Sequence, residues 1–237
     1  MSERYTPAPV GQVALIGLFV TGLVTAQLTA AKLITVSLPA ALPTVGNSIV
    51  LPGAALAYAL TFFASDCYAE LYGRRAAQIV VNVAFTMNFV VLALLWTTIL
   101  APAVNPEFAA TFRTALAPGT NIILGSLFAY VVSQNWDVVV FHRLRELTDG
   151  SYLWLRNVGS TATSQAIDTV IFVSVAFVVA PQYLGIGSPT PASVVVSLVV
   201  GQYLLKLLIA LADTPFVYAV VGILRSRGHA PAVVPAD

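Results

Sequence analysis

Residues 76–106 read AAQIVVNVAFTMNFVVLALLWTTILAPAVNP and contain no Asp, Glu, Lys or Arg. An α-helix needs about 20 predominantly apolar residues to cross the roughly 30 Å hydrocarbon core of a bilayer, and this stretch is longer. Four further stretches without these residue types are also long enough: 5–31, 33–65, 114–136 and 169–205. The sequence therefore predicts an integral membrane protein with several spanning helices.

Composition leads to the same conclusion. Only 9% of the 237 residues are charged and 58% are hydrophobic, whereas about 25% of a typical soluble domain is charged. The formal net charge of +1 gives no strongly basic surface for a nucleic acid. A soluble domain, an acidic disordered chain and a nucleic-acid-binding protein are excluded on these grounds. One cysteine, Cys67, leaves no intramolecular disulfide to consider.

The apolar stretches, together with the positions of Pro, Gly and charge, predict an all-α fold with six transmembrane helices. We expect these helices near 10–33, 49–71, 77–100, 120–142, 160–180 and 192–223. The connections are too short for a second domain, so residues 1–237 are expected to form one membrane domain. Pro215 lacks a backbone donor and is expected to kink or break the last helix.

The arginines predict the orientation, because basic residues of short loops stay on the cytoplasmic side. A cytoplasmic N-terminus leaves only Arg113 outside and places the other arginines inside: Arg4, Arg74, Arg75, Arg143, Arg145, Arg156, Arg225 and Arg227. An even number of helices then puts both termini in the cytoplasm. We expect a multi-pass protein of the plasma or inner membrane, in contact with lipid.

Charged residues nevertheless fall within the predicted helices or at their ends, namely Asp66, Glu70, Asp137, Asp168, Lys206 and Asp213. A central Asp or Lys costs about 2.5–3.5 kcal/mol on insertion scales, so several such residues need compensation. The default hypothesis is an internal polar cavity that handles a solute or ions.

A cassette of polar and aromatic residues occurs twice, at an offset of 31 residues. The matching positions are Ser133, Gln134, Asp137, Val139 and Phe141 in the fourth predicted helix and Ser164, Gln165, Asp168, Val170 and Phe172 in the fifth. Gln and Asp three residues apart, with Phe seven after the Gln, share one helix face. Antiparallel neighbours can turn two such faces toward each other.

Such a face suits a planar heterocycle with N–H groups. Carboxylates accept from ring N–H groups and exocyclic amines, side-chain amides donate and accept, and aromatic rings stack on the base. The alternative is that Gln and Asp only hold the two helices together, since interhelical polar pairs contribute about 0.6–2 kcal/mol each. Two matching cassettes favour the binding hypothesis.

A second group of charges ends the second predicted helix in DCYAELYGRR, residues 66–75. Asp66 lies one turn deeper than Glu70 and is expected to line the cavity. Glu70 and Arg74 have the spacing of an i, i+4 ion pair, which favours an interface salt bridge as the alternative. Asp213 either contacts the solute, accepts backbone donors freed near Pro215, or pairs with Lys206, which we interpret as a charge partner.

Enzyme signatures do not occur in the sequence. There is no metal-ligand spacing, nucleophile elbow, Walker loop or dinucleotide fingerprint. We therefore expect no catalytic residue, no metal, no cofactor and no enzymatic activity. Gly22, Ala26 and Ala30 recur every four residues, a small-residue stripe that either packs inside the bundle or docks a partner subunit.

Four motifs occur in a fixed order along residues 12–224. They are SDCYAELYGR (65–74), SQNWD (133–137), WLRN (154–157) with ST (160–161) and SQAIDT (164–169), and DTP (213–215). In this order they resemble the queuosine precursor transporter family, also called the vitamin uptake transporter family. The resemblance implies six helices and import of 7-deazaguanine bases, such as 7-cyano-7-deazaguanine, for tRNA modification.

The resemblance also implies signature roles for Asp66, Glu70, Gln134, Asp137, Arg156, Gln165, Asp168 and Asp213. We expect Asp168 or Asp137 to accept from the guanine edge and Gln134 and Gln165 to contact the carbonyl or substituent side. Phe141 and Phe172 are expected to flank the ring, and Arg74, Arg156 and Lys206 to neutralise charge.

Three functional classes remain open at this point. The leading one is a solitary carrier, whose self-association into a homo-oligomer the sequence does not decide. The second is the substrate-binding subunit of an energy-coupling-factor transporter for a vitamin or nucleobase, which would dock through the small-residue stripe. The third, a membrane enzyme or structural subunit, predicts no saturable uptake.

Overall fold

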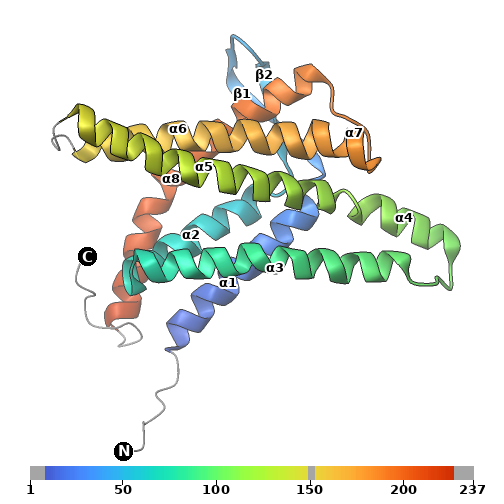
Figure 1. The fold of residues 1–237 in the computed structure, drawn as a ribbon, viewed down its shortest axis with the longest axis horizontal. Helices are drawn as coiled ribbons and strands as arrows, with labels where there is room; N and C mark the ends of the chain where they lie inside the picture. The colour runs from blue at the N-terminus through green and yellow to red at the C-terminus, as the bar shows by residue number, and fades with distance from the viewer. Residues whose placement is uncertain (1–8, 149–152, 227–237) are drawn as a thin grey trace, which may run out of the picture. The chain divides into compact units, whose positions relative to one another are not determined.

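The computed structural model describes residues 9–148 and 153–226, without the side chains of residues 153–157 (Figure 1). Its elements, in chain order, are α1 (Val10–Thr29), β1 (Leu33–Leu42), β2 (Gly46–Pro52), α2 (Ala55–Tyr72), α3 (Arg74–Leu100), α4 (Pro106–Leu116), α5 (Gly119–Leu147), α6 (Leu153–Ser174), the π-helical segment η1 (Val175–Val179), α7 (Ala180–Leu184) and α8 (Ala192–Ser226).

Five helical segments of the described residues are long and apolar enough to cross a membrane. They are Val10–Thr29, Arg74–Leu100, Pro106–Leu147, Val158–Leu184 and Ala192–Ser226. The prediction of a helical, multi-pass membrane protein is thereby confirmed, while the number of six and the cytoplasmic termini stay predictions. The predicted helix near 49–71 corresponds to α2, which carries Asp66 and Glu70 and is not among the five.

The hairpin β1–β2 departs from the predicted all-α fold: the connection expected between the helices near 10–33 and 49–71 forms two strands, together with the facing ends of those helices. Its strands pair antiparallel, with Thr35 opposite Val50, and the register shifts between Ser37 and Leu42. Ile34, Thr35 and Val36 are β-branched and favour a strand, and Pro39 interrupts any helix there. The first and second helices are therefore shorter than predicted at their facing ends.

Close contact with α8 holds this hairpin. The backbone N–H of Val50 donates to Ser197 Oγ at 2.9 Å. A Cβ atom on Gly201 would lie 2.7 Å from the Val50 carbonyl oxygen, so glycine is needed for the approach. Of the kink or break expected at Pro215, the break does not occur, because α8 continues through that residue to Ser226; the kink stays a prediction.

The chain divides into two compact units. Unit 1 contains the chain up to Ala26, Ala54–Val91 and the chain from Lys206 onward, and unit 2 contains Gln27–Gly53 and Leu92–Leu205. Neither unit is one continuous segment, because α1, α3 and α8 each pass from one unit to the other. The prediction of a single domain over residues 1–237 is not tested by this division.

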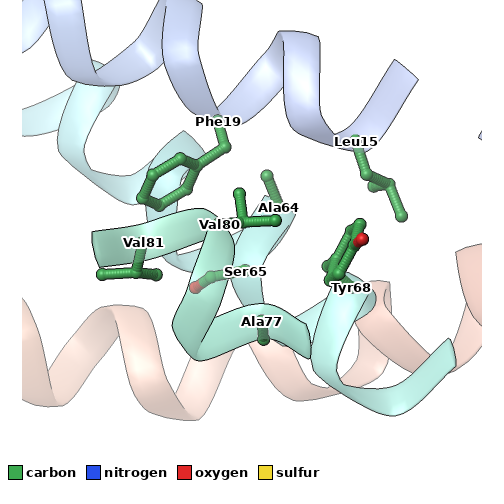
Figure 2. Close-up of a pocket in the computed structure, with 8 residues that line it drawn as sticks. All are labelled: Leu15, Phe19, Ala64, Ser65, Tyr68, Ala77, Val80 and Val81. Atoms are coloured by element: carbon green, nitrogen blue, oxygen red, sulfur yellow. The ribbon is translucent and has the colours of Figure 1, made fainter. Parts of the chain in front are cut away.

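Unit 1 is built on packing among α1, α2 and α3. Figure 2 shows Leu15 and Phe19 of α1 near Ala64 and Tyr68 of α2, with Val80 of α3 beside them. The space among them measures only about 10 Å³, the size of about one water molecule and too small for an organic solute. This void is part of the core and not a binding site.

The small-residue stripe of α1 takes part in this packing. A Cβ atom on Gly22 would lie 3.1 Å from the Ala57 carbonyl oxygen and 3.1 Å from Thr61 Cγ2, both in α2. Ala26 of unit 1 is buried as well; Ala30 is also buried, but it follows the end of α1 and belongs to unit 2. The alternative in which the stripe packs inside the bundle is therefore the one that the structure favours.

Unit 2 is built around the antiparallel pair α5 and α6, which run side by side (Figure 1). Ile123 and Ala129 of α5 are fully or almost fully buried, as is Val173 of α6. Gly125 lets α5 approach η1, because a Cβ atom there would lie 2.7 Å from Ala176 Cβ. The close approach positions the polar residues further along both helices.

Gly125→Ala is expected to destabilise the protein by about 1–3 kcal/mol, the usual cost of overpacking a filled core. The added methyl group meets both the side chain and the backbone of Ala176, which have no flexible end that can move aside. Thermal unfolding in detergent measures the effect. Gly17→Ala is the matched control, because a Cβ atom at Gly17 has nothing within 4 Å; equal midpoints for both variants would contradict the prediction.

Candidate functional site

The two cassettes meet across α5 and α6 through reciprocal hydrogen bonds. Ser133 Oγ of α5 donates to Asp168 Oδ1 of α6 at 3.3 Å. In return, Ser164 Oγ of α6 donates to Asp137 Oδ1 of α5 at 3.2 Å. The serines are 5% and 6% exposed and the two aspartates are half-buried. The expectation that the two polar faces turn toward each other is confirmed for these residues.

The two serines were not predicted to have a role. Each belongs to its cassette and lies four residues before that cassette's aspartate, so it shares the aspartate's helix face. The four-residue spacing is the sequence signal that each serine lies beside an aspartate. Because each hydroxyl bonds the carboxylate of the other helix, the serines hold the two aspartates in place without neutralising their charge.

The glutamines of the two cassettes differ in their surroundings. Gln165 is half-buried, and its Oε1 atom is buried without a hydrogen-bond partner among the described residues. Gln134 is exposed. The cassettes therefore repeat in sequence but do not give two equivalent amide positions, and Gln165 is the one that offers a buried acceptor beside Asp168.

The aromatic residues of the cassettes also differ. Phe172 meets Phe177 of η1 edge to face, with ring centroids 5.9 Å apart. Phe141 meets the neighbouring His142 ring at 6.1 Å, also edge to face. Both phenylalanines are half-buried. Their predicted contact with a bound ring stays a prediction.

A separate polar cavity lies within unit 1, where α2, the start of α3 and α8 come together. Its volume is about 310 Å³, and its polar wall consists of Asp66, Glu70, Arg74, Asp213 and Thr214. Asp213 Oδ2 is buried and has no hydrogen-bond partner among the described residues. The structure thus brings together the acidic residues that the sequence singled out in the second and last predicted helices.

The ion pair of Glu70 differs from the predicted one. Among the described residues Glu70 pairs with Arg225, whose Nη2 lies 3.2 Å from Glu70 Oε1, and not with Arg74. The same Arg225 nitrogen donates to the Glu70 carbonyl oxygen at 3.1 Å. Arg225 therefore contacts two oxygens of Glu70, the carboxylate and the backbone carbonyl. Arg74 instead lines the cavity.

The other predicted charge partners stand as follows. Lys206 is buried, and its Nζ lies 5.9 Å from the centroid of the Tyr58 ring, a cation–π distance. The side chain of Arg156 lies outside the described part of the structure. Within residues 9–148 and 153–226, no three His, Cys, Asp or Glu side chains are grouped so that they could hold a metal ion.

The predicted binding residues therefore form two clusters, one in each unit. The carboxylate pair of α5 and α6, with its serines and Gln165, belongs to unit 2. The cavity of Asp66 and Asp213 belongs to unit 1. A carboxylate that a serine hydroxyl holds in place has further lone pairs, which can accept hydrogen bonds from the N–H groups of a polar solute.

Comparison with known proteins shows which family the chain resembles. The family model described as "putative vitamin uptake transporter" matches residues 52–220, a range that contains both clusters. A protein of Bacillus subtilis (strain 168), named "probable queuosine precursor transporter", is 35% identical over 167 residues, which cover 68% of each chain. No solved structure matches.

The matched residues cover more than half of the chain and include all the motifs on which the resemblance rested. The family is one of transporters and not of enzymes. The long apolar helices and the two polar clusters of this chain fit a transporter, because a membrane carrier needs apolar helices with polar groups held between them. The chain belongs to the vitamin uptake transporter family.

Proposed function

We propose that this protein imports queuosine precursors, 7-deazaguanine bases such as 7-cyano-7-deazaguanine, across the cell membrane for tRNA modification. The proposal extends the name of the Bacillus subtilis relative to this chain. The observation that carries it is the reciprocal Ser–Asp arrangement of α5 and α6, which holds two carboxylates on facing helices.

The chemistry of a guanine-like base matches these groups. Its ring N–H and exocyclic amine lie side by side and can donate to the two oxygens of one carboxylate. We assign this role to Asp168, or to Asp137 opposite it. The base carbonyl accepts from an amide NH₂ group, which Gln165 or Gln134 supplies, while the ring lies against Phe141 or Phe172.

The cavity of unit 1 provides a second set of contacts in this proposal. Its volume of about 310 Å³ lies at the lower end of the range of about 300–1,000 Å³ that is typical of small-molecule pockets. Asp66 and Asp213 can accept from the N–H groups of the base, and Arg74 can donate to its oxygen. Glu70 contributes less, because its carboxylate already pairs with Arg225.

A solitary carrier is favoured over a subunit of an energy-coupling-factor transporter. A subunit of such a transporter would use the small-residue stripe of α1 to dock on its partner. Gly22 of that stripe is in contact with α2 of the same chain, so this part of the stripe is not free to receive a partner helix. The proposal is therefore that the chain transports its substrate without an ATPase.

Uptake by intact cells tests this function. Cells that cannot synthesise 7-deazaguanines are expected to accumulate labelled 7-cyano-7-deazaguanine only when they carry this protein, and an excess of an unlabelled 7-deazaguanine should suppress the uptake. Guanine itself is the specificity control, since it keeps the hydrogen-bonding edge and lacks the 7-substituent. Equal accumulation with and without the protein would refute the proposal.

A further inference from the structure

Unit 2 contains a larger cavity that none of the predicted residues lines. Its volume is about 440 Å³, and it lies between the chain that follows α1, the junction of α4 and α5, η1, and the segment after α7. All of these segments belong to unit 2. The cavity is within the size range of small-molecule pockets and is separate from the Ser–Asp contacts of α5 and α6.

Asn121 gives this cavity a fixed polar group. The side chain is 3% exposed, and its Nδ2 atom donates to the Ile186 carbonyl oxygen at 2.8 Å. Its Oδ1 atom is buried and has no partner among the described residues. A buried acceptor without a hydrogen bond is unfavourable, so a ligand N–H that reaches this atom would be stabilised there.

The other walls supply a cation, hydroxyl groups and an aromatic ring. Lys32 contributes an ammonium group, Thr114 and Thr190 contribute hydroxyls, and Phe177 contributes its ring. An ammonium group has three donors and no acceptor. The wall therefore offers donors for a carbonyl or nitrile on one ligand edge and an acceptor, Asn121, for an N–H on another.

The backbone around the cavity departs from regular helix in two places. Phe177 lies in the π-helical segment η1, and such segments occur frequently at functional sites. Gly185 and Gly187 have φ angles of 64° and 76°, which favour glycine, and they flank Ile186. Two hydrogen bonds hold this segment, the one from Asn121 and one from the Thr190 N–H to the Phe177 carbonyl oxygen at 2.8 Å.

We propose that this cavity is a further binding site for the transported planar heterocycle, at the outer end of unit 2. This proposal rests on the proposed function and names a site in addition to the α5–α6 cassette and the unit 1 cavity. The outer position follows from the orientation predicted from the arginines, which places the start of α5 and the hairpin outside the cell. Asn121 accepts from a ring N–H, Lys32 donates to the carbonyl or nitrile, and Phe177 borders the ring.

Cysteine protection tests the site directly. Thr114 lines the cavity and Thr111 does not, yet both are exposed residues of α4 whose hydroxyls donate to the carbonyl four residues earlier. Thr114→Cys and Thr111→Cys are therefore a matched pair in the full chain. The native Cys67 is fully buried and adds little background. Intact cells are treated with a membrane-impermeant maleimide, with and without 7-cyano-7-deazaguanine.

The expected result is that both cysteines react from outside and that the base slows only Thr114→Cys. At a roughly tenfold excess over Kd, mass action leaves the site empty about one tenth of the time, so labelling should slow about tenfold. Ser188→Cys, also at an exposed position of the cavity wall, serves if Thr114→Cys does not reach the membrane.

Each other outcome has a distinct meaning. Uptake without protection of either cavity cysteine overturns this site and leaves the proposed function intact. Absence of both uptake and protection overturns both proposals. Cavity cysteines that react only after the cells are permeabilised overturn the outer position, and equal protection of Thr111→Cys shows a general conformational change instead of occupancy of the cavity.

Discussion

Asp168→Asn is expected to reduce uptake of a 7-deazaguanine about ten- to hundredfold, because a hydrogen bond to a charged group contributes about 1.5–3 kcal/mol. Asparagine keeps the shape of the side chain and can still accept from Ser133. It loses the negative charge and places an NH₂ group where one of the base donors would bind. Initial uptake rates, divided by the amount of folded protein in the membrane, measure the effect.

Ser133→Ala separates binding from helix packing. This variant removes the hydroxyl donor to Asp168 and leaves the carboxylate charged. If Asp168 binds the base, Ser133→Ala reduces uptake much less than Asp168→Asn. Equal uptake in Asp168→Asn and the wild type, at equal protein levels, would show that the carboxylate only joins α5 to α6.

Asp66→Asn and Asp213→Asn are each expected to reduce uptake about tenfold or more, by the same loss of a charged acceptor. Both residues line the cavity of unit 1. Asp213 Oδ2 has no partner among the described residues, so the charge is available to a solute. Uptake rates normalised to membrane protein are again the measurement.

Glu146→Gln is the control for these two variants. Glu146 is an exposed carboxylate near the end of α5, paired with Arg143 at 3.4 Å, and an exposed pair contributes at most about 1 kcal/mol. Its uptake should match the wild type. Uptake in Asp66→Asn and Asp213→Asn as high as in Glu146→Gln would remove the unit 1 cavity from the transport mechanism.

The helices could be predicted from the sequence because hydrophobic length is a strong signal in a membrane protein. The hairpin of residues 33–52 could not, since its apolar, uncharged sequence continues that of the helices on both sides. Residues 106–116 form α4 although they follow several breakers; Asn105 caps this helix by accepting from the Phe108 N–H at 3.0 Å, and Pro106 begins it.

The sequence predicts which residues form the candidate site better than it predicts which residues contact one another there. A repeated spacing locates Asp137 and Asp168 on facing helix faces, because helix geometry alone fixes which positions share a face. The partners of a charge depend on tertiary packing, so the pairing of Glu70 with Arg225, 155 residues away, had no local signal. The cavity beside Asn121 was missed for the same reason, as its walls come from distant segments.

Uptake into vesicles that contain only this purified chain shows whether the chain transports the base by itself. We expect saturable uptake of labelled 7-cyano-7-deazaguanine, strongly reduced by Asp168→Asn and retained in Glu146→Gln. If vesicles with the wild-type protein take up the base no faster than protein-free vesicles, the chain is not a solitary carrier of this base.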